Sequence, residues 1–97
     1  MRIVWAPFAR DDLISIRSYI SQHNPKAARL TAVRILHTVN LLSERPELGM
    51  STHRDDVRRL LVSNSVYSII YRLRESDIEI IEIFDGRQAA PRSNLTP

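Results

Sequence analysis

Five arginines fall on or just after the strand-like segments in the C-terminal half of the sequence. Of the 14 lysines and arginines in the 97 residues, all but Lys26 are arginine. A guanidinium group holds a phosphate or a carboxylate through two parallel hydrogen bonds, so an arginine cluster suits a nucleic acid or an acidic protein surface. At a net charge of +3, a genomic bias toward arginine explains the excess equally well. The clustered arginines are Arg58, Arg59, Arg72, Arg74 and Arg87.

RNA cleavage is the reaction that such a cluster could assist, because arginine stabilises the negative charge that develops on a phosphate. That reaction also benefits from a general base and a general acid near the 2′-hydroxyl and the leaving oxygen. The sequence offers Tyr67, Tyr71 and Glu82, which form no recognisable catalytic pattern. The alternative is that the tyrosines are core rings and that the arginines pair with Glu79, Glu82 or an acidic partner. These residues favour binding over catalysis, and we predict no catalytic residue.

Metal and cofactor sites are not predicted from the remaining polar residues. The chain has no cysteine, and no two histidines have the short spacing that metal sites use. The two glycines are too far apart to form a phosphate-binding loop. Asp11 and Asp12 are expected to face solvent in a first helical turn, where the helix dipole favours negative charge. The histidines are His23, His37 and His53.

Two amphipathic helices are predicted to position these side chains. The apolar residues from Phe8 to Gln22 recur at spacings of 4, 3 and 4, which places them on one stripe of a helix. Asn24-Pro25 predicts the start of a second helix, because asparagine caps free amides and proline suits the first turn. Pro46 ends that helix near Glu44 or Arg45. The residues expected to be buried are Ala9, Leu13, Ile16, Ile20, Ala28, Ala32, Ile35, Val39 and Leu42.

Strand-like segments lie on both sides of the helices. The first runs from Arg2 to Trp5 and is stopped by Pro7. Residues 46–56 lack apolar periodicity and are expected to form a loop. The three later runs are rich in β-branched residues, and their short polar connections favour antiparallel hairpins. The last of them is apolar at almost every position, as expected of a central strand covered on both faces. The three runs are Val57 to Val62, Val66 to Leu73 and Ile78 to Phe84.

The element order β-α-α-β-β-β predicts an α+β fold in which a helical hairpin packs on one face of an antiparallel sheet. A chain of this length builds one hydrophobic core, so we predict a single domain over residues 1–87 and a C-terminal tail over residues 88–97. The opposite face of the sheet is the expected place of function. The lack of cysteine, of a signal-peptide core and of a long apolar run predicts a soluble, unsecreted protein of the cytoplasm.

The order of these segments resembles the ParE/RelE toxin superfamily. The similarity spans residues 2–87 and is carried by the helix ARDDLISIRSYI, the helix start NPKAA, the segment LLSERPELG and the strand block VRRLLVSNSVYSIIYRLRESDIEIIEIFDGR. The Pro46-x-x-Gly49 loop before an arginine-rich strand is most similar to the ParE branch. The resemblance implies the toxin of a bacterial type II toxin-antitoxin system, such as those that stabilise plasmids. It also implies a cognate antitoxin, ParD-like and DNA-binding, that wraps over the toxin.

The two branches of the superfamily imply different activities. ParE-like toxins inhibit DNA gyrase, trap broken DNA and arrest growth, whereas RelE-like toxins cut mRNA on the ribosome. ParE-like chains often read Leu-His-Gly at the end of the last strand, where this sequence reads Phe84-Asp85-Gly86-Arg87. RelE itself relies on lysines, and Lys26 is far from the strands in sequence. The resemblance thus favours gyrase inhibition over RNA cleavage. A degenerate, non-toxic homologue that still binds antitoxin is a third alternative, because of Asp85 in place of histidine.

We also predict which residues contact the target and which contact the antitoxin. Target binding is assigned to the end of the last strand and to arginines of the sheet: Arg58, Arg59, Arg72 and Arg87. Antitoxin binding is assigned to Ile70 and Arg72, because an uncovered Ile70 would leave an aggregation-prone patch. An amphipathic helix followed by an extended segment is the expected form of the bound antitoxin. No cofactor is expected.

Overall fold

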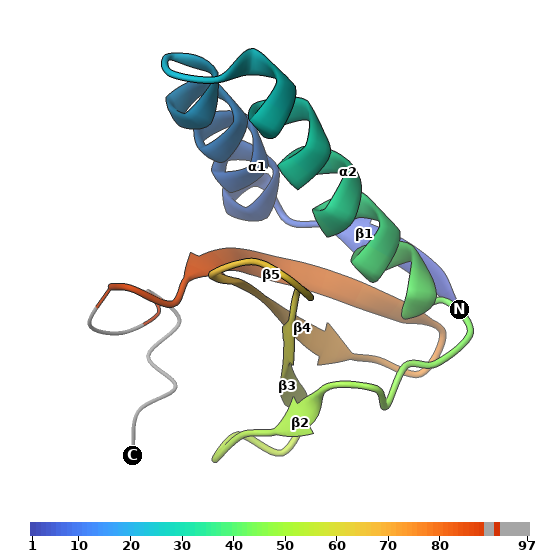
Figure 1. Ribbon diagram of the computed structural model, residues 1–97. Coiled ribbons are helices and arrows are strands. Elements are labelled where there is room, and N and C mark those ends of the chain that lie inside the picture. The colour runs from blue at the N-terminus through green and yellow to red at the C-terminus, as the bar shows by residue number, and fades with distance from the viewer. Residues whose placement is uncertain (89–90, 92–97) are drawn as a thin grey trace.

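The computed structural model describes residues 1–88 and 91, and it arranges the chain in two layers (Figure 1). One layer is a five-stranded sheet, and the other is a pair of helices that lie together on one face of that sheet. The predicted α+β fold with a helical hairpin on a sheet is therefore confirmed. The elements are β1 Arg2–Trp5, α1 Pro7–Ser21, α2 Pro25–Leu41, β2 Met50–Ser51, β3 Val57–Leu61, β4 Tyr67–Leu73 and β5 Asp77–Asp85.

Each helix begins at a proline that fixes the backbone of the first turn. In front of α2, the Oδ1 atom of Asn24 accepts a hydrogen bond from the backbone N–H of Ala27 at 3.1 Å. The α2 helix ends at Leu41, a few residues before the predicted end. Its last turn tightens there, since the N–H groups of residues 42–44 donate to carbonyls three residues earlier. Neither helix, within the described part of the chain, is long and apolar enough to cross a membrane.

The sheet has the order β1-β5-β4-β3-β2 and is mixed. The later strands pair antiparallel, as predicted, but β1 pairs parallel with β5, with Arg2 opposite Asp77 and Trp5 opposite Ile80. The prediction of an antiparallel sheet is wrong at this edge. A short connection predicts how two strands pair only when they are neighbours in sequence, and β1 and β5 are not. The segment predicted as a loop also contains β2, whose two residues are too few to show a period.

A β-bulge in β5 decides which side chains of that strand face the helices. Ile80 pairs with β4 residue Tyr71 and Glu82 pairs with Ile70, so Ile81 has no partner on β4. Strict alternation from Ile80 would turn Glu82 toward the helices. The extra residue instead places Ile83 in the main core. Glu82 shifts to the opposite side of the strand, so a carboxylate is kept out of the helix-facing core.

The main core lies between the two layers and contains most of the residues predicted to be buried. Ala9 of α1 and Ile35, Val39 and Leu42 of the second helical segment are almost completely buried. The remaining predicted residues of α1 are partly buried against the same core. The predicted tail lies outside the described residues except for Gln88, whose N–H donates to the Asp85 carbonyl at 3.0 Å, and Pro91.

Candidate functional site

The alternation of β3 places two neighbouring candidate arginines on opposite faces of the sheet. Arg58 lies opposite Tyr71, which belongs to the core under the helices. Arg59 lies opposite Ile70, whose side chain belongs to a second cluster outside that core. Since cross-strand partners share a face, Arg58 points to the helix side and Arg59 points away from it. The expectation that the arginines converge on one free face is therefore wrong for Arg58.

Arg58 fastens the loop between α2 and β2. Its guanidinium donates to the carbonyl of Gly49 at 2.8 Å and to that of Glu47 at 3.4 Å. The Tyr71 hydroxyl supports the same loop, because it donates to the Pro46 carbonyl at 2.8 Å and accepts from the Gly49 N–H at 2.8 Å. The Tyr71 side chain is fully buried, and burial raises the pKa of its hydroxyl. Tyr71 is thus the predicted core ring, and its hydroxyl is closed to a substrate.

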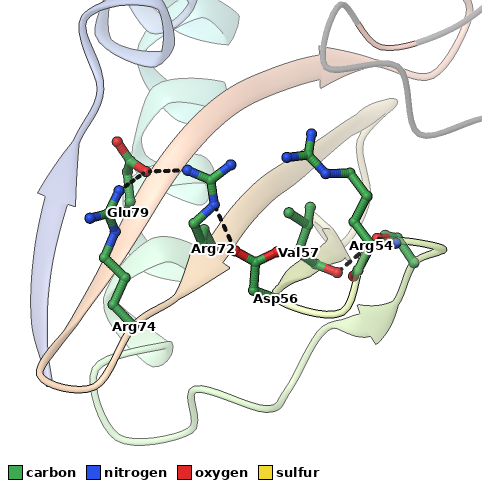
Figure 2. A network of polar contacts seen from close by, with 7 residues as sticks. Arg54, Asp56, Val57, Arg72, Arg74 and Glu79 are labelled. Carbon is green, nitrogen blue, oxygen red and sulfur yellow. Dashed lines mark hydrogen bonds and ion pairs between the residues drawn. The ribbon is translucent and has the colours of Figure 1, made fainter.

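Arg72 is held by the chain's own carboxylates on the face away from the helices (Figure 2). Its Nε atom lies 3.0 Å from the Asp56 carboxylate, as an ion pair without the direction of a hydrogen bond. Its terminal nitrogen Nη1 donates to Oε1 of Glu79 at 3.3 Å, and Nη2 of Arg74 donates to the same oxygen at 2.9 Å. The paired arginines expected from the sequence are confirmed here. The charge of Arg72 is therefore largely compensated within the molecule.

Arg59, like Arg58, forms no ion pair with a carboxylate among residues 1–88 and 91. Its guanidinium carbon stands 5.1 Å from the centroid of the Phe84 ring, a cation–π distance. Phe84, Val57 and Ile70 form the second apolar cluster, and Ile70 has no exposed surface. The expectation that Ile70 is uncovered in the isolated chain is therefore wrong. We call this side of the sheet, with Arg59, Ile70 and Arg72, the outer face.

Arg87 lies apart from the other three arginines, in a groove between α1 and the end of β5. The groove has a volume of about 470 Å³. It exists because β1 ends at Trp5, and no other strand of the described residues pairs with the second half of β5 on that side. The residues that line it are Asp12, Ser15, Ile16, Tyr19, Tyr67, Glu82, Ile83, Phe84, Asp85, Arg87 and Gln88. We call it the α1–β5 groove.

Arg87 and Asp85 form a bidentate ion pair at one end of the α1–β5 groove. Nε of Arg87 donates to Oδ1 at 3.0 Å and a terminal nitrogen donates to Oδ2 at 2.7 Å. The Arg87 backbone N–H adds a third hydrogen bond to Oδ1 at 2.9 Å. The hydrogen bonds from Arg87 lower the pKa of the Asp85 carboxyl, and those to Asp85 raise the pKa of Arg87. The Arg87 side chain is 62% exposed, so a partner could still reach the guanidinium.

Asp12 joins the helix layer to the sheet in this groove. Its Oδ2 atom accepts a hydrogen bond from the Ile83 N–H at 3.1 Å. At Ile83, β5 pairs with β4 on one side, and no strand among the described residues pairs with it on the other side, beyond the end of β1. The assignment of Asp11 and Asp12 to a first helical turn is wrong, because α1 already begins at Pro7. The sequence does contain a signal for Asp12. It precedes Ile16 and Tyr19 at spacings of 4 and 3, which places all three at one border of the buried stripe.

Tyr19 and Tyr67 bring two hydroxyl groups to the same groove. Tyr67 is the core ring that the sequence predicts, and burial followed by the nearby Asp85 raises its pKa. Tyr19 is largely exposed and packs edge-on against His23. Within residues 1–88 and 91, no three histidine, aspartate or glutamate side chains lie close enough to hold a metal ion.

Comparison with known families identifies this architecture. The family model described as the ParE toxin of type II toxin-antitoxin system, parDE, matches residues 3–90. The chain is 32% identical over 91 residues to Putative toxin Y4kP of Sinorhizobium fredii, covering 94% of each protein. It is 34% identical over 82 residues to Toxin RelE2 of Caulobacter vibrioides, covering 84% of this chain and 91% of that toxin.

Solved structures share the fold. A chain from the chromosomal ParDE toxin-antitoxin system of P. aeruginosa superposes with a TM-score of 0.79 at 23% identity, over 88% of this chain and 95% of that one. A chain of the YoeB dimer from Staphylococcus aureus gives a TM-score of 0.56 at 13% identity, over 86% and 93% of the two chains. The chain belongs to the ParE toxin family of type II toxin-antitoxin systems, within the ParE/RelE superfamily that its sequence resembles.

Proposed function

We propose that this member of the ParE toxin family arrests bacterial growth by binding DNA gyrase and holding it on broken DNA. We also propose that a cognate, ParD-like antitoxin suppresses this activity in the cytoplasm. The family's description refers to the parDE pair, and the P. aeruginosa chain of the same fold comes from a ParDE system. Both support an antitoxin as the partner.

The neutralisation of two candidate arginines, Arg72 and Arg87, is the observation that carries the choice of a protein target. Arg87 is bound by Asp85, and Arg72 is bound by Asp56 and Glu79. An RNA-cleaving site needs uncompensated cations that meet phosphates. Arginines already held by carboxylates suit the rim of a protein interface, where a fixed guanidinium orients a partner through its remaining donors.

Arg59 and Arg87 are the arginines that we propose to contact gyrase. Arg59 keeps its charge on the outer face, and Arg87 presents its exposed edge beside the end of β5. Target binding through Arg58 and Arg72 stays a prediction from the sequence. Arg58 already serves the loop before β2, so its replacement would change that loop as well as any contact with a target.

The antitoxin contacts assigned to Ile70 and Arg72 also stay predictions. Because Ile70 has no exposed surface, an antitoxin on the outer face would first meet the side chains that cover it. Arg72, with a side chain 28% exposed, is the more accessible of the two. A contact with Ile70 itself would require those side chains to move aside.

Growth after induction of the toxin in a bacterial host tests the part assigned to Arg87. We expect Arg87→Ala to relieve growth arrest while the purified chain keeps its fold and its binding to antitoxin. Arg17→Ala is the matched control, because Arg17 is an exposed arginine of α1 that does not line the α1–β5 groove. An Arg87→Ala chain that is folded and fully toxic would reject the assignment.

Ribosome-dependent cleavage of mRNA is the second candidate function. The name of the Caulobacter relative, Toxin RelE2, supports it, as does the presence of Tyr19 and Tyr67 beside Arg87 in one groove. In that function a tyrosine would transfer a proton while Arg87 contacts a phosphate. Cuts at fixed codon positions in mRNA, lost in Tyr67→Phe, would favour this candidate over gyrase inhibition. Normal growth without antitoxin would instead indicate a homologue that has lost toxicity.

A further inference from the structure

The α1–β5 groove contains hydrogen-bond donors that suit a phosphate group. Arg87 stands at one end of it, and Tyr19 and Tyr67 line the same groove. A guanidinium holds a phosphate through two parallel hydrogen bonds, and phenol hydroxyls can donate to the remaining oxygens. The chain has a net charge of +3, which attracts polyanions to its surface. By its donors alone, the groove would therefore suit a phosphate of RNA.

Asp85 already occupies the position that a phosphate would take on Arg87. Its two oxygens accept hydrogen bonds from Nε and Nη2 of Arg87 at 3.0 and 2.7 Å, the bidentate arrangement in which a guanidinium holds a phosphate. The Arg87 backbone N–H donates to the same carboxylate at 2.9 Å and closes a short turn. A phosphate from solution would have to displace an acceptor that is tethered two residues away and held by the backbone.

The charge of the groove opposes a phosphate as well. Its lining includes the carboxylates of Asp12, Glu82 and Asp85 against the single guanidinium of Arg87. The Asp85 side chain is only 20% exposed, so solvent ions screen its charge incompletely. An entering phosphate would therefore meet a negative groove in a chain that is positive as a whole.

One nitrogen of Arg87 remains for a partner. Nη1 makes no hydrogen bond within residues 1–88 and 91, whereas Nε and Nη2 are engaged by Asp85. The pair of Asp85 and Arg87 is neutral overall, so it exerts little net attraction on an anion. A neutral acceptor such as a backbone carbonyl can still accept from Nη1. The pair thus favours the acceptors that a protein surface offers.

We propose that Asp85 is a specificity-determining residue, which keeps phosphate groups, and with them RNA, off Arg87. It restricts Arg87 to neutral acceptors on a protein partner. The second statement deepens the proposed function and rests on it, because it concerns the chemistry that the target presents to Arg87. The exclusion of phosphate does not rest on it, because it follows from the geometry of the pair and from the charge of the groove.

Binding of a short single-stranded RNA to the purified chain tests the exclusion. The RNA carries 2′-O-methyl groups, so its own hydroxyls cannot attack the phosphates. Asp85→Asn keeps an acceptor for the Arg87 backbone N–H but removes the charge. We expect it to bind this RNA at least about tenfold more tightly than wild type, because a charged hydrogen-bond pair to phosphate is gained. The logarithm of its binding constant should also fall more steeply with the logarithm of salt, by about 0.7, as for one added phosphate contact.

Two further variants make this gain specific to Arg87. Glu75→Gln is the matched control, because it changes the net charge by the same amount. Glu75 is exposed in the turn between β4 and β5 and forms no ion pair within residues 1–88 and 91. Its RNA affinity should stay within about twofold of wild type. The double variant Asp85→Asn with Arg87→Ala should lose the gain, since the guanidinium that binds the phosphate is then absent.

Inorganic phosphate gives a local readout. In a titration followed by NMR, the Nε–H resonance of Arg87 should shift in Asp85→Asn and stay in place in wild type. Circular dichroism checks that each variant is folded. Asp85→Ser is the second variant, because its hydroxyl is neutral and can still accept from the Arg87 backbone N–H. It should show the same gain for RNA.

Equal RNA affinity in wild type and in a folded Asp85 variant would overturn the inference. So would an equal gain in Glu75→Gln, or RNA binding by wild type that Arg87→Ala weakens, because phosphate would then reach Arg87 in spite of Asp85. In the gyrase assay, added RNA should compete with gyrase for Asp85→Asn and not for wild type. The RNA measurements do not involve gyrase, so a chain that shows the gain but leaves gyrase unaffected would reject the proposed target and keep the role of Asp85.

Discussion

Contacts with the buried Tyr71 hydroxyl explain why the Pro46-x-x-Gly49 segment ends in glycine. The hydroxyl lies between the Pro46 carbonyl and the Gly49 N–H, at 2.8 Å from each. A Cβ atom on Gly49 would come within 2.7 Å of that oxygen and 3.0 Å of the Arg59 carbonyl. A side chain at position 49 would therefore displace the hydroxyl or the strand. The loop that leads from α2 into the sheet is fixed by these contacts.

Removal of this hydroxyl should destabilise the fold. Tyr71→Phe leaves a buried N–H and a carbonyl without their partner, which costs about 1–3 kcal/mol in the free energy of unfolding. Tyr67→Phe is the control, because Tyr67 is also a core ring but its hydroxyl makes no hydrogen bond within residues 1–88 and 91. Urea denaturation of both variants measures the difference. Equal stabilities for the two would refute the role of the Tyr71 hydroxyl.

The Asp85–Arg87 pair should make stability depend on pH in the acid range. The pKa of Asp85 is lowered in the folded chain, chiefly by hydrogen bonds from Arg87, so the folded state favours the carboxylate. That contribution is complete above the unfolded pKa of about 3.9 and is lost as pH falls through the lower folded pKa. Wild type should therefore be more stable than Asp85→Asn at pH 7, and the two should converge below about pH 4.

Denaturation of both proteins between neutral and acid pH measures this difference. Arg87→Gln removes the side-chain hydrogen bonds of the pair but keeps the backbone hydrogen bond to Asp85, so in that background Asp85→Asn should change the pH dependence less than it does in wild type. If the stability difference between wild type and Asp85→Asn grew as the pH fell, it would contradict a stabilising role of the Asp85–Arg87 pair.

At the scale of elements, the sequence predicts what periodicity and end signals can encode. The two helices, their buried stripes and the three later strands follow from spacing, Asn24-Pro25 and short polar turns. The parallel pairing of β1 depends on contacts between the two ends of the domain, which no local pattern reports. The bulge at Ile81 is also hidden, because an apolar run has no alternation to break.

The attachment of α1 to the sheet should depend on Asp12. Asp12→Ala removes the acceptor of the Ile83 N–H and should lower the free energy of unfolding by about 1–2 kcal/mol. Asp11→Ala is a close control, since Asp11 is exposed on the same helix turn and should change stability by less than about 0.5 kcal/mol. Hydrogen exchange at Ile83 reports the local effect. Unchanged protection of that amide in Asp12→Ala would contradict the contact.

At the scale of the whole molecule, the candidate site is only partly predictable. The sequence identifies the arginines but not their division between two faces and a groove, because that division depends on strand register and on where β1 ends. Ile70 illustrates the same limit, since its position in the strand indicates the outer face but not its complete burial.

Gyrase activity in the presence of the purified chain is the most direct test of the proposed function. The assay follows DNA supercoiling and cleavage by gyrase, with and without the antitoxin. The proposal predicts loss of supercoiling and accumulation of cleaved DNA, both reversed by the antitoxin, with Arg87→Ala less active than Arg17→Ala. Unaffected supercoiling and no cleaved DNA at toxin concentrations that saturate the antitoxin would contradict it.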